Sequence, residues 1–297
     1  MNRFLNLTLP VLILLGAVVN AKTITVCESC TINSIKKGIA SAQSFDTLFV
    51  KKGVYREHSL RIDKPLTLMG ENHPIIDGNK EGEIITVLAD NVTIDGFFII
   101  NVGRSYTEDY AAIRIKRSNY FEIKNVVLEK LFFGIYIEKS NYGQIYHNKI
   151  IGDAKEEYNS GNGIQLWYSN HVVIENNHVQ GVRDGIYLEF ANHCSLKGNT
   201  STNNIRYGLH FMFSNNDLYQ DNHFENNGAG VAVMFSKKIK MIGNHFKKNW
   251  GTASYGMLLK EINDAEIRNN IFDENTIGIN IEGANRILYK NNDFINN

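Results

Sequence analysis

A repeat of about 22 residues is the sequence feature that most limits how this chain can fold. Seven short apolar segments each open on a glycine: Gly134, Gly163, Gly185, Gly208, Gly230, Gly256 and Gly278. Fourteen residues after each glycine comes an asparagine: Asn148, Asn177, Asn199, Asn222, Asn244, Asn270 and Asn292. A fixed period of this kind is typical of a solenoid, in which each unit packs only on its neighbours.

Each unit is predicted to contain short strands joined by turns. The residues one and three after the glycine are apolar, as in Ile186 and Leu188, and alternation places them inward. The residues two and four after the glycine are therefore expected on an open outer surface. A later strand brings an inward column of Phe224, Phe246, Phe272 and Phe294. The predicted fold class is all-β, a single-domain right-handed parallel β-helix, with a leucine-rich repeat as the second choice.

The composition supports the same stack. The chain has 38 asparagines, and its 3 prolines all precede residue 75, so the repeats contain none. Asparagines at a turn can hydrogen-bond along the axis as a ladder, and their tolerance of left-handed backbone angles suits that turn. Proline would delete a ladder hydrogen bond in almost any coil. Ala111 with Asn125, and Gly82 with Gly96, are expected to continue the register toward the N-terminus.

The N-terminus is expected to be a targeting segment. Residues 1–21 run from Arg3 through an apolar stretch to Val19-Asn20-Ala21, which predicts a cleavable signal peptide and export from the cytoplasm. Residues 22–45 form the predicted N-terminal cap, with a short capping helix suggested by Ile35 and Ile39 at helical spacing. Residues 46–297 form the predicted β-helix, and a further C-terminal region is expected to be missing.

Charge and cysteine content narrow the function. With 31 basic and 31 acidic residues, the chain lacks the basic excess of a nucleic-acid binder. Cys27 and Cys30 form a Cys-x-x-Cys, which in an oxidising compartment favours a local disulfide over a thiol pair that binds metal or exchanges electrons. Cys194 falls at an inward position and is expected to be a small core residue.

The outer columns hold one candidate metal site. His210 and Met212 share a strand face, and Met234 falls beside Met212 on the next coil. One imidazole and two thioethers are ligands suited to Cu(I). The residues alone favour, ahead of copper, a patch that docks a partner or simply packs, because methionine adapts to many surfaces.

The same face carries candidate docking residues. Arg183 and Arg206 precede neighbouring strands beside Asp184, and they are predicted either to bind a partner carboxylate or to form an internal ion pair. The remaining candidates are Trp167, Tyr187, Glu189 and Lys260. His178, His223 and His245 are expected to be solvated turn residues.

Enzymatic machinery is not expected. Glycoside hydrolysis needs a pair of carboxylates on one surface. Glu189 has no acidic neighbour on the adjacent coils, which carry Trp167 and Met212 at the equivalent position. A secreted polysaccharide-binding or polysaccharide-cleaving β-helix remains the alternative function.

The central repeats resemble a known family. The specific segments are Arg206-Tyr207-Gly208-Leu209-His210-Phe211-Met212 and Ala229-Gly230-Val231-Ala232-Val233-Met234-Phe235-Ser236. They are similar to NosD, an exported β-helix protein of nitrous oxide reductase maturation in denitrification. Gly53-Val54-Tyr55 and Lys64-Pro65-Leu66 extend the resemblance weakly to the N-terminal part.

The resemblance implies a role in copper supply rather than catalysis. NosD proteins are expected to act in the periplasm with the ATPase and membrane subunits of an ABC transporter, a copper chaperone and nitrous oxide reductase. The resemblance implies membrane contact only through the transporter, and transient Cu(I) rather than a resident cofactor. It also favours His210, Met212 and Met234, which lie within the matching segments, as the candidate copper contacts.

Overall fold

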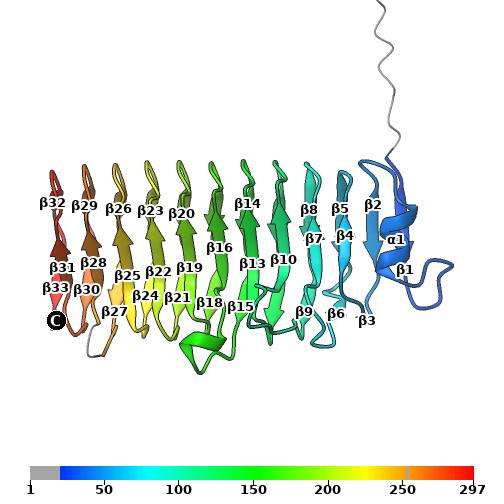
Figure 1. Ribbon diagram of the computed structural model, residues 1–297, viewed down its shortest axis with the longest axis horizontal. Helices are drawn as coiled ribbons and strands as arrows, with labels where there is room; N and C mark the ends of the chain where they lie inside the picture. The colour runs from blue at the N-terminus through cyan, green and yellow to red at the C-terminus, as the bar shows by residue number, and fades with distance from the viewer. Residues whose placement is uncertain (1–20, 252–253) are drawn as a thin grey trace, which may run out of the picture.

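A computed structural model describes residues 21–251 and 254–297, and these form a stack of β-coils (Figure 1). The predicted signal peptide falls almost entirely on residues 1–20, outside the described residues. Within them, no helix is long and apolar enough to cross a membrane. All strand pairs are parallel, and they form sheets of 12, 11 and 10 strands. The predicted right-handed parallel β-helix is confirmed.

Three sheets run the length of the stack, and each complete coil contributes one strand to each sheet, whereas the first and last coils are incomplete. The 12-stranded sheet, sheet A, contains β1 Thr23–Val26, β2 Thr47–Val50, β5 Leu66–Gly70, β8 Val92–Asp95, β11 Glu122–Lys124, β14 Gln144–Tyr146, β17 Val173–Glu175, β20 Ser195–Lys197, β23 Leu218–Gln220, β26 Lys240–Ile242, β29 Glu266–Arg268 and β32 Leu288–Lys290.

The 11-stranded sheet, sheet B, contains β3 Val54–Arg56, β6 Ile75–Asp77, β9 Phe98–Ile100, β12 Val127–Glu129, β15 Lys149–Ile151, β18 His178–Gln180, β21 Thr200–Thr202, β24 His223–Glu225, β27 His245–Lys247, β30 Ile271–Asp273 and β33 Asp293–Ile295.

The 10-stranded sheet, sheet C, contains β4 Leu60–Ile62, β7 Ile85–Val87, β10 Ala111–Lys116, β13 Phe133–Glu138, β16 Ile164–Trp167, β19 Asp184–Glu189, β22 Tyr207–Met212, β25 Ala229–Met234, β28 Met257–Lys260 and β31 Ile279–Glu282.

The N-terminal cap contains the one helix longer than a single turn in the described residues, α1 Ile35–Ser41. Ser34 accepts a hydrogen bond from the Lys37 amide, which makes it the N-cap. Ile35 and Ile39 are buried, so the spacing that predicted this helix also supplies its packing face. Strand β1 already pairs with β2, so the sheet begins inside the region predicted as cap.

The core lies inside the coils and follows the predicted alternation. The residues one and three after each repeat glycine are buried through Met257 and Leu259. The phenylalanine column is also inside, with ring centroids 5.5 Å apart for Phe224–Phe246 and 4.6 Å apart for Phe246–Phe272. In the last coil Ile281 and Phe294 are about half exposed.

The seven asparagines form a ladder at the turn between sheets A and B. Each side-chain amide except that of Asn292, the last in the ladder, donates to the next asparagine Oδ1, for example Asn199 Nδ2 to Asn222 Oδ1 at 3.0 Å. The same nitrogen also donates to a backbone carbonyl of the preceding coil, Ile174 O at 2.8 Å for Asn199. Because these groups are buried, every bond of the ladder replaces one that water would have made.

The predicted backbone angle is wrong by one residue, and the predicted N-terminal register is wrong by one residue at Ala111 and by two at Gly82. The left-handed conformation belongs to the residue before each ladder asparagine, such as Asn176 at φ 53° and Asp221 at φ 53°. Ala112, not Ala111, occupies the glycine position, because Ile113 pairs with Ile135. Asn125, at φ 52°, therefore occupies the left-handed position, as Gly96 does one coil earlier.

Candidate functional site

The outer face of sheet C is not the open surface that simple alternation predicts. The position two residues after the repeat glycine is buried in several coils, with Tyr136 8%, His210 3% and Ala232 0% exposed. Two long connections from sheet B to sheet C, residues 101–110 and 152–163, lie beside this face and are fastened together. Arg104 bonds both the Asp153 carboxylate and, at 3.3 Å, the Asn159 carbonyl.

His210 lies at the centre of a buried polar cluster on this face. Its Nδ1 is 3.4 Å from Asp184 Oδ2 and 3.3 Å from Arg206 Nη2. Its ring packs against Tyr187 and Tyr207, with centroids 5.0 and 4.9 Å away. His210 Nε2 is buried and has no hydrogen-bond partner among the described residues. That nitrogen is the one free to bind a soft cation, while the other is oriented by a carboxylate.

Arg206 joins this cluster to the connection above it. Its Nε lies 3.5 Å from Asp184 Oδ1, and its Nη1 lies 3.0 Å from Glu157 Oε1 in the 3-10 turn η1 Glu157–Asn159. Burial acts to lower the pKa of Arg206, but Asp184 and Glu157 outweigh it and raise that pKa. Arg206 is therefore part of an internal ion pair, the second of the two predicted alternatives.

Arg183 and Asp184 take different positions from those expected of docking residues. Arg183 is half-buried and donates to Asn162 Oδ1 at 3.2 Å, although it is the neighbour of Arg206 on the preceding coil. Asp184 is 0% exposed, so the prediction that it contacts a partner is wrong. The reason is that β19 begins at Asp184, whose carboxylate lies beneath Arg206 and beside His210.

The two methionines lie side by side at the edge of this cluster. Met212 pairs in register with Met234, and Glu189 pairs with Met212 on the other side. Both thioether side chains are half-buried. His210 lies two residues before Met212 on the same face of β22, so the structure brings the three predicted copper contacts to one part of sheet C.

The other predicted docking residues flank the methionines. Trp167 pairs in register with Glu189, and Lys260 pairs with Met234 and is exposed. Tyr187 donates to Glu189 Oε2 at 3.2 Å, and burial raises the Tyr187 pKa, with Glu189 adding to the effect.

A column of stacked aromatic rings borders the methionines on the outside. Tyr168, Phe190, Phe213 and Phe235 stack with centroids 4.5 to 5.1 Å apart. Phe213 and Phe235 follow Met212 and Met234 directly, and both have left-handed φ angles near 50°. Bulky residues adopt that conformation at a cost of about 1–2 kcal/mol. The column is also open to water, with Phe213 38% and Phe235 45% exposed.

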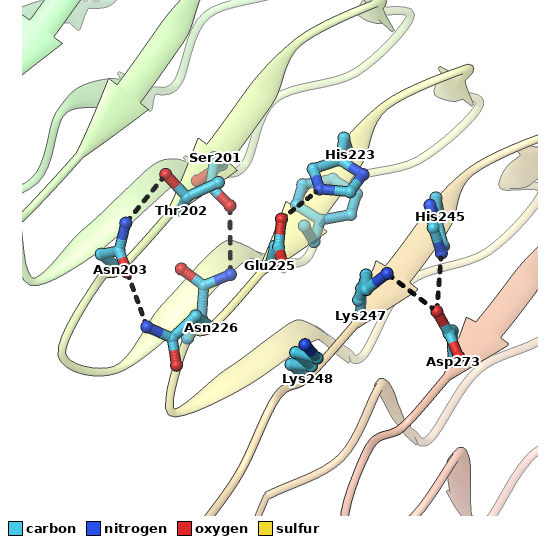
Figure 2. A network of polar contacts seen from close by, with 12 residues as sticks. Ser201, Thr202, Asn203, His223, Glu225, Asn226, His245, Lys247, Lys248 and Asp273 are labelled. Atoms are coloured by element: carbon cyan, nitrogen blue, oxygen red, sulfur yellow. Dashed lines mark hydrogen bonds and ion pairs between the residues drawn. The ribbon is translucent and has the colours of Figure 1, made fainter. Parts of the chain in front are cut away.

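A second histidine cluster lies on sheet B (Figure 2). His223 Nε2 is 2.9 Å from Glu225 Oε2, and His245 Nε2 is 3.8 Å from Asp273 Oδ2. Burial lowers the pKa of His245, and His223 lowers it further. Lys247 lies 3.2 Å from the same Asp273 carboxylate and opposes a bound cation there. His178 is bound to Gln180 at 2.9 Å.

The cysteines and the titratable side chains offer no other metal site in the part of the chain that the structure describes. Cys27 and Cys30 form a disulfide. Cys194 is a buried free thiol whose pKa is raised by burial. No group of three or more His, Cys, Asp or Glu side chains could hold a metal ion within residues 21–251 and 254–297.

The family comparison decides the wider context of this site. Residues 147–297, half of the chain, match the model of the family described as periplasmic copper-binding protein (NosD). The chain belongs to the NosD family. The matched NosD segment contains His210, Met212 and Met234, and the family description names a periplasmic copper-binding protein.

A curated relative agrees with the NosD assignment. The probable ABC transporter binding protein NosD of Pseudomonas aeruginosa is 32% identical over 126 residues, which are 42% of this chain and 29% of that protein. The chain therefore matches less than a third of the relative's length.

Solved structures show the same fold in proteins of very different sequence. The A-module of Azotobacter vinelandii mannuronan C-5 epimerase AlgE4 is 13% identical with a TM-score of 0.62, covering 88% of this chain and 89% of that one. PfbA, a surface adhesin of Streptococcus pneumoniae, is 14% identical with a TM-score of 0.63, covering 88% and 85%. XylC in complex with xylose is 10% identical with a TM-score of 0.66, covering 87% and 70%. These similarities confirm the β-helix of this NosD-family chain and nothing of its activity.

Sequence reasoning missed several residues that shape the outer face of this NosD-family chain. Glu83, Arg114, Tyr136 and Glu138 meet in a cleft, and Glu157 holds Arg206. The sequence did contain a signal for the position of Glu157. The step from Gly134 to Gly163 is 29 residues long, and its extra length is the connection that carries η1.

Proposed function

We propose that this chain is a non-enzymatic periplasmic accessory protein that presents copper during maturation of nitrous oxide reductase. The observation that carries the proposal is the soft-donor group of His210, Met212 and Met234 inside the segment that matches the NosD family. Copper is cargo in this role, held transiently as Cu(I), and the β-helix supplies a rigid frame for the donors.

The chemistry of the donor set fits Cu(I). The two thioether sulfurs are soft ligands that suit Cu(I), and neutral imidazole nitrogen binds copper as well, whereas a hard cation such as Ca²⁺ prefers oxygen ligands. His210 offers Nε2, which has no hydrogen-bond partner among the described residues, and Asp184 on Nδ1 fixes the ring orientation. No carboxylate is needed as a direct ligand, so a hard cation gains little here.

Access to the imidazole requires local movement. His210 is 3% exposed, and Arg206 joins its Nδ1 side to Glu157 on the connection 152–163. Met212 and Met234 are half-buried and face solvent in part, so they are the first donors that copper meets. The imidazole completes the site when the Arg206–Glu157 ion pair opens.

The proposed partners are the ATPase and membrane subunits of an ABC transporter, a copper chaperone and nitrous oxide reductase. The name of the Pseudomonas aeruginosa relative supports the transporter association, and the family resemblance supports the others. The docking surface is the exposed border of the methionines, formed by Trp167, Tyr187, Glu189 and Lys260 with the aromatic column. Membrane contact occurs only through the transporter.

The test is the copper content of nitrous oxide reductase made in cells that carry the His210→Ala, Met212→Ala, Met234→Ala triple variant. We expect reductase depleted of copper, since the soft donors are gone. The matched control is His223→Ala with His245→Ala, which removes two half-buried imidazoles from sheet B and is expected to leave reductase copper unchanged. Normal copper content in the triple variant, with protein levels maintained, contradicts the site.

A further inference from the structure

An open cleft of about 410 Å³ lies on the outer face of sheet C, on coils nearer the N-terminus than the methionines. Arg114 and Lys116 from β10, with Tyr136 and Glu138 from β13, form its floor. Residues 107–110, the end of the long connection before β10, form a wall, and Trp167 lines the side toward β16. Its size is that of a small-ligand site.

The charges of the floor are held in pairs. Arg114 Nε lies 2.5 Å from Glu83 Oε2, and Arg114 Nη1 lies 3.5 Å from Glu138 Oε2. Lys116 Nζ lies 3.3 Å from Glu138 Oε1. The Arg114 guanidinium also stacks 4.3 Å from the Tyr136 ring centroid. Together with Glu83, the floor thus presents fixed donors and acceptors with no net charge, already oriented before any ligand arrives.

The wall adds negative charge and is fastened to the floor. Arg114 Nη2 donates to the Asp109 carbonyl, which holds the wall in place. With Glu108 and Asp109, the lining has four carboxylates against two basic groups. A ligand that itself carries carboxylates is repelled, whereas a neutral or cationic ligand is not.

A peptide fits this cleft poorly. Strand β10 is paired on both sides, with β7 and β13, so it has no free edge to which a peptide strand can add. The lining is mainly polar and charged, so it lacks the apolar groove that an amphipathic helix needs.

Sugars fit the lining well. A sugar hydroxyl both donates and accepts, so it can bridge a carboxylate and a guanidinium that are already paired. The apolar face of a pyranose ring packs on aromatic side chains, and Tyr110, Tyr136 and Trp167 line the cleft. We propose that this cleft binds pyranose sugars without carboxylates, either neutral or amino sugars, at a site separate from the copper donors.

Tryptophan fluorescence gives a direct test, because the chain has only two tryptophans, Trp167 and Trp250. Trp250 is 61% exposed and is not part of the cleft, so Trp250→Phe leaves Trp167 as the sole reporter. The probes are the tetramers of N-acetylglucosamine and glucosamine, with trigalacturonate as the acidic counterpart and tetralysine as a cationic peptide.

We expect a saturable change in Trp167 emission with at least one of the two tetramers and weaker or no binding of trigalacturonate. The Trp167→Phe protein, which reports from Trp250, is expected to show no change. Glu138→Gln weakens sugar binding at least about tenfold, because it removes the negative charge and one of the two acceptor oxygens that pair with Arg114 and Lys116. Lys116→Ala, at a 41% exposed side chain, weakens binding in a variant whose folding is not at risk.

Three results overturn the proposal: no saturable response to either tetramer, trigalacturonate binding as tightly as the sugars, or a response to tetralysine alone. The His210→Ala, Met212→Ala, Met234→Ala variant is expected to keep the sugar affinity within about twofold, because its substitutions lie outside the cleft. A loss of sugar binding in that variant contradicts the separation of the two sites.

Discussion

The molecule carries two columns of stacked aromatic rings, one inside the coils and one outside. Phe246 and Phe272 stack at 4.6 Å inside, and Phe190 and Phe213 stack at 5.0 Å outside, with nearly parallel rings in both pairs. The inner rings are fully buried, and the outer rings are partly open to water on left-handed backbone. The repeat by itself is therefore enough to stack the rings in both columns. Only the burial of the inner column makes its stacking important for the stability of the fold.

The same contrast separates the interior of the coils from the outer face of sheet C. Inside, apolar residues recur at most inward positions, because every coil packs on similar neighbours. On the outer face, the long connections 101–110 and 152–163 and the side chains change from coil to coil. The cleft has residues 107–110 of one long connection as its wall, and Glu157 of the other reaches Arg206 beside His210. These departures from the repeat favour this face as the functional one.

The largest effect is expected from breaking the inner column. Phe246→Ala removes a fully buried ring and is expected to cost about 3–5 kcal/mol in the free energy of unfolding. Phe213→Ala in the outer column is the matched control. It is expected to cost less than about 1 kcal/mol in the free energy of unfolding, because the Phe213 ring stays 38% exposed in the folded protein. Chemical denaturation measures both, and equal losses contradict the contrast.

The next effect concerns two asparagine ladders. Asn222 is 2% exposed, and its side chain bonds Asn199, Asn244 and the Leu196 carbonyl. Asn222→Ala leaves those buried groups unpaired and is expected to cost about 2–3 kcal/mol. Asn215→Ala, in the half-exposed ladder between sheets C and A, is expected to cost less than about 1 kcal/mol. A comparable loss at the two positions in urea unfolding refutes the role of burial.

Arg206 tests the polar cluster on the outer face. Arg206→Ala leaves the fully buried Asp184 carboxylate without its cation and frees Glu157, so we expect a loss of about 2 kcal/mol and faster amide exchange in residues 152–163. Arg268→Ala removes the more exposed Arg268–Glu266 pair on sheet A and is expected to change stability by less than about 1 kcal/mol. Unchanged exchange in the connection after Arg206→Ala rules out the tether.

Asp217 gives the interior of the coils a pH dependence. Burial raises the pKa of Asp217 to about 8, although Cys194 N and Tyr219 Oη donate to it. The unfolded carboxyl loses its proton near pH 4 while the folded one keeps it until about pH 8. Stability therefore falls as pH rises across that window, by up to about 1.4 kcal/mol per pH unit.

Asp217→Asn isolates this contribution. The variant is expected to lose the fall in unfolding free energy between pH 4 and 8 relative to the unsubstituted protein, and to be the more stable of the two at pH 8. Urea unfolding across the pH range measures the difference. Parallel pH profiles for the two proteins mean that Asp217 is ionised in the fold.

The repeat made the fold predictable, and its interruptions limited what could be predicted of the site. The inward positions and the Asn199–Asn222 ladder follow from spacing, because each coil repeats the contacts of the last. The left-handed residue was misplaced by one, since asparagine occupies both neighbouring positions, as Asn176 and Asn177 show.

The burial of His210 could not be read from alternation. It depends on where Glu157 and Arg206 meet, and the repeat does not encode the path of the connection that carries Glu157. The pairing of Met212 with Met234 was predictable, because it needs only the register of β22 and β25. The cleft was missed for the same reason as the burial, because residues 107–110 form its wall.

The most direct test of the copper role is a Cu(I) titration of the purified chain in competition with a chromophoric Cu(I) chelator, under reducing, oxygen-free conditions. We predict that one Cu(I) binds and that the His210→Ala, Met212→Ala, Met234→Ala variant loses at least about a hundredfold in affinity, while His223→Ala with His245→Ala retains it. Equal Cu(I) affinity in the triple variant and the unsubstituted protein would contradict the account.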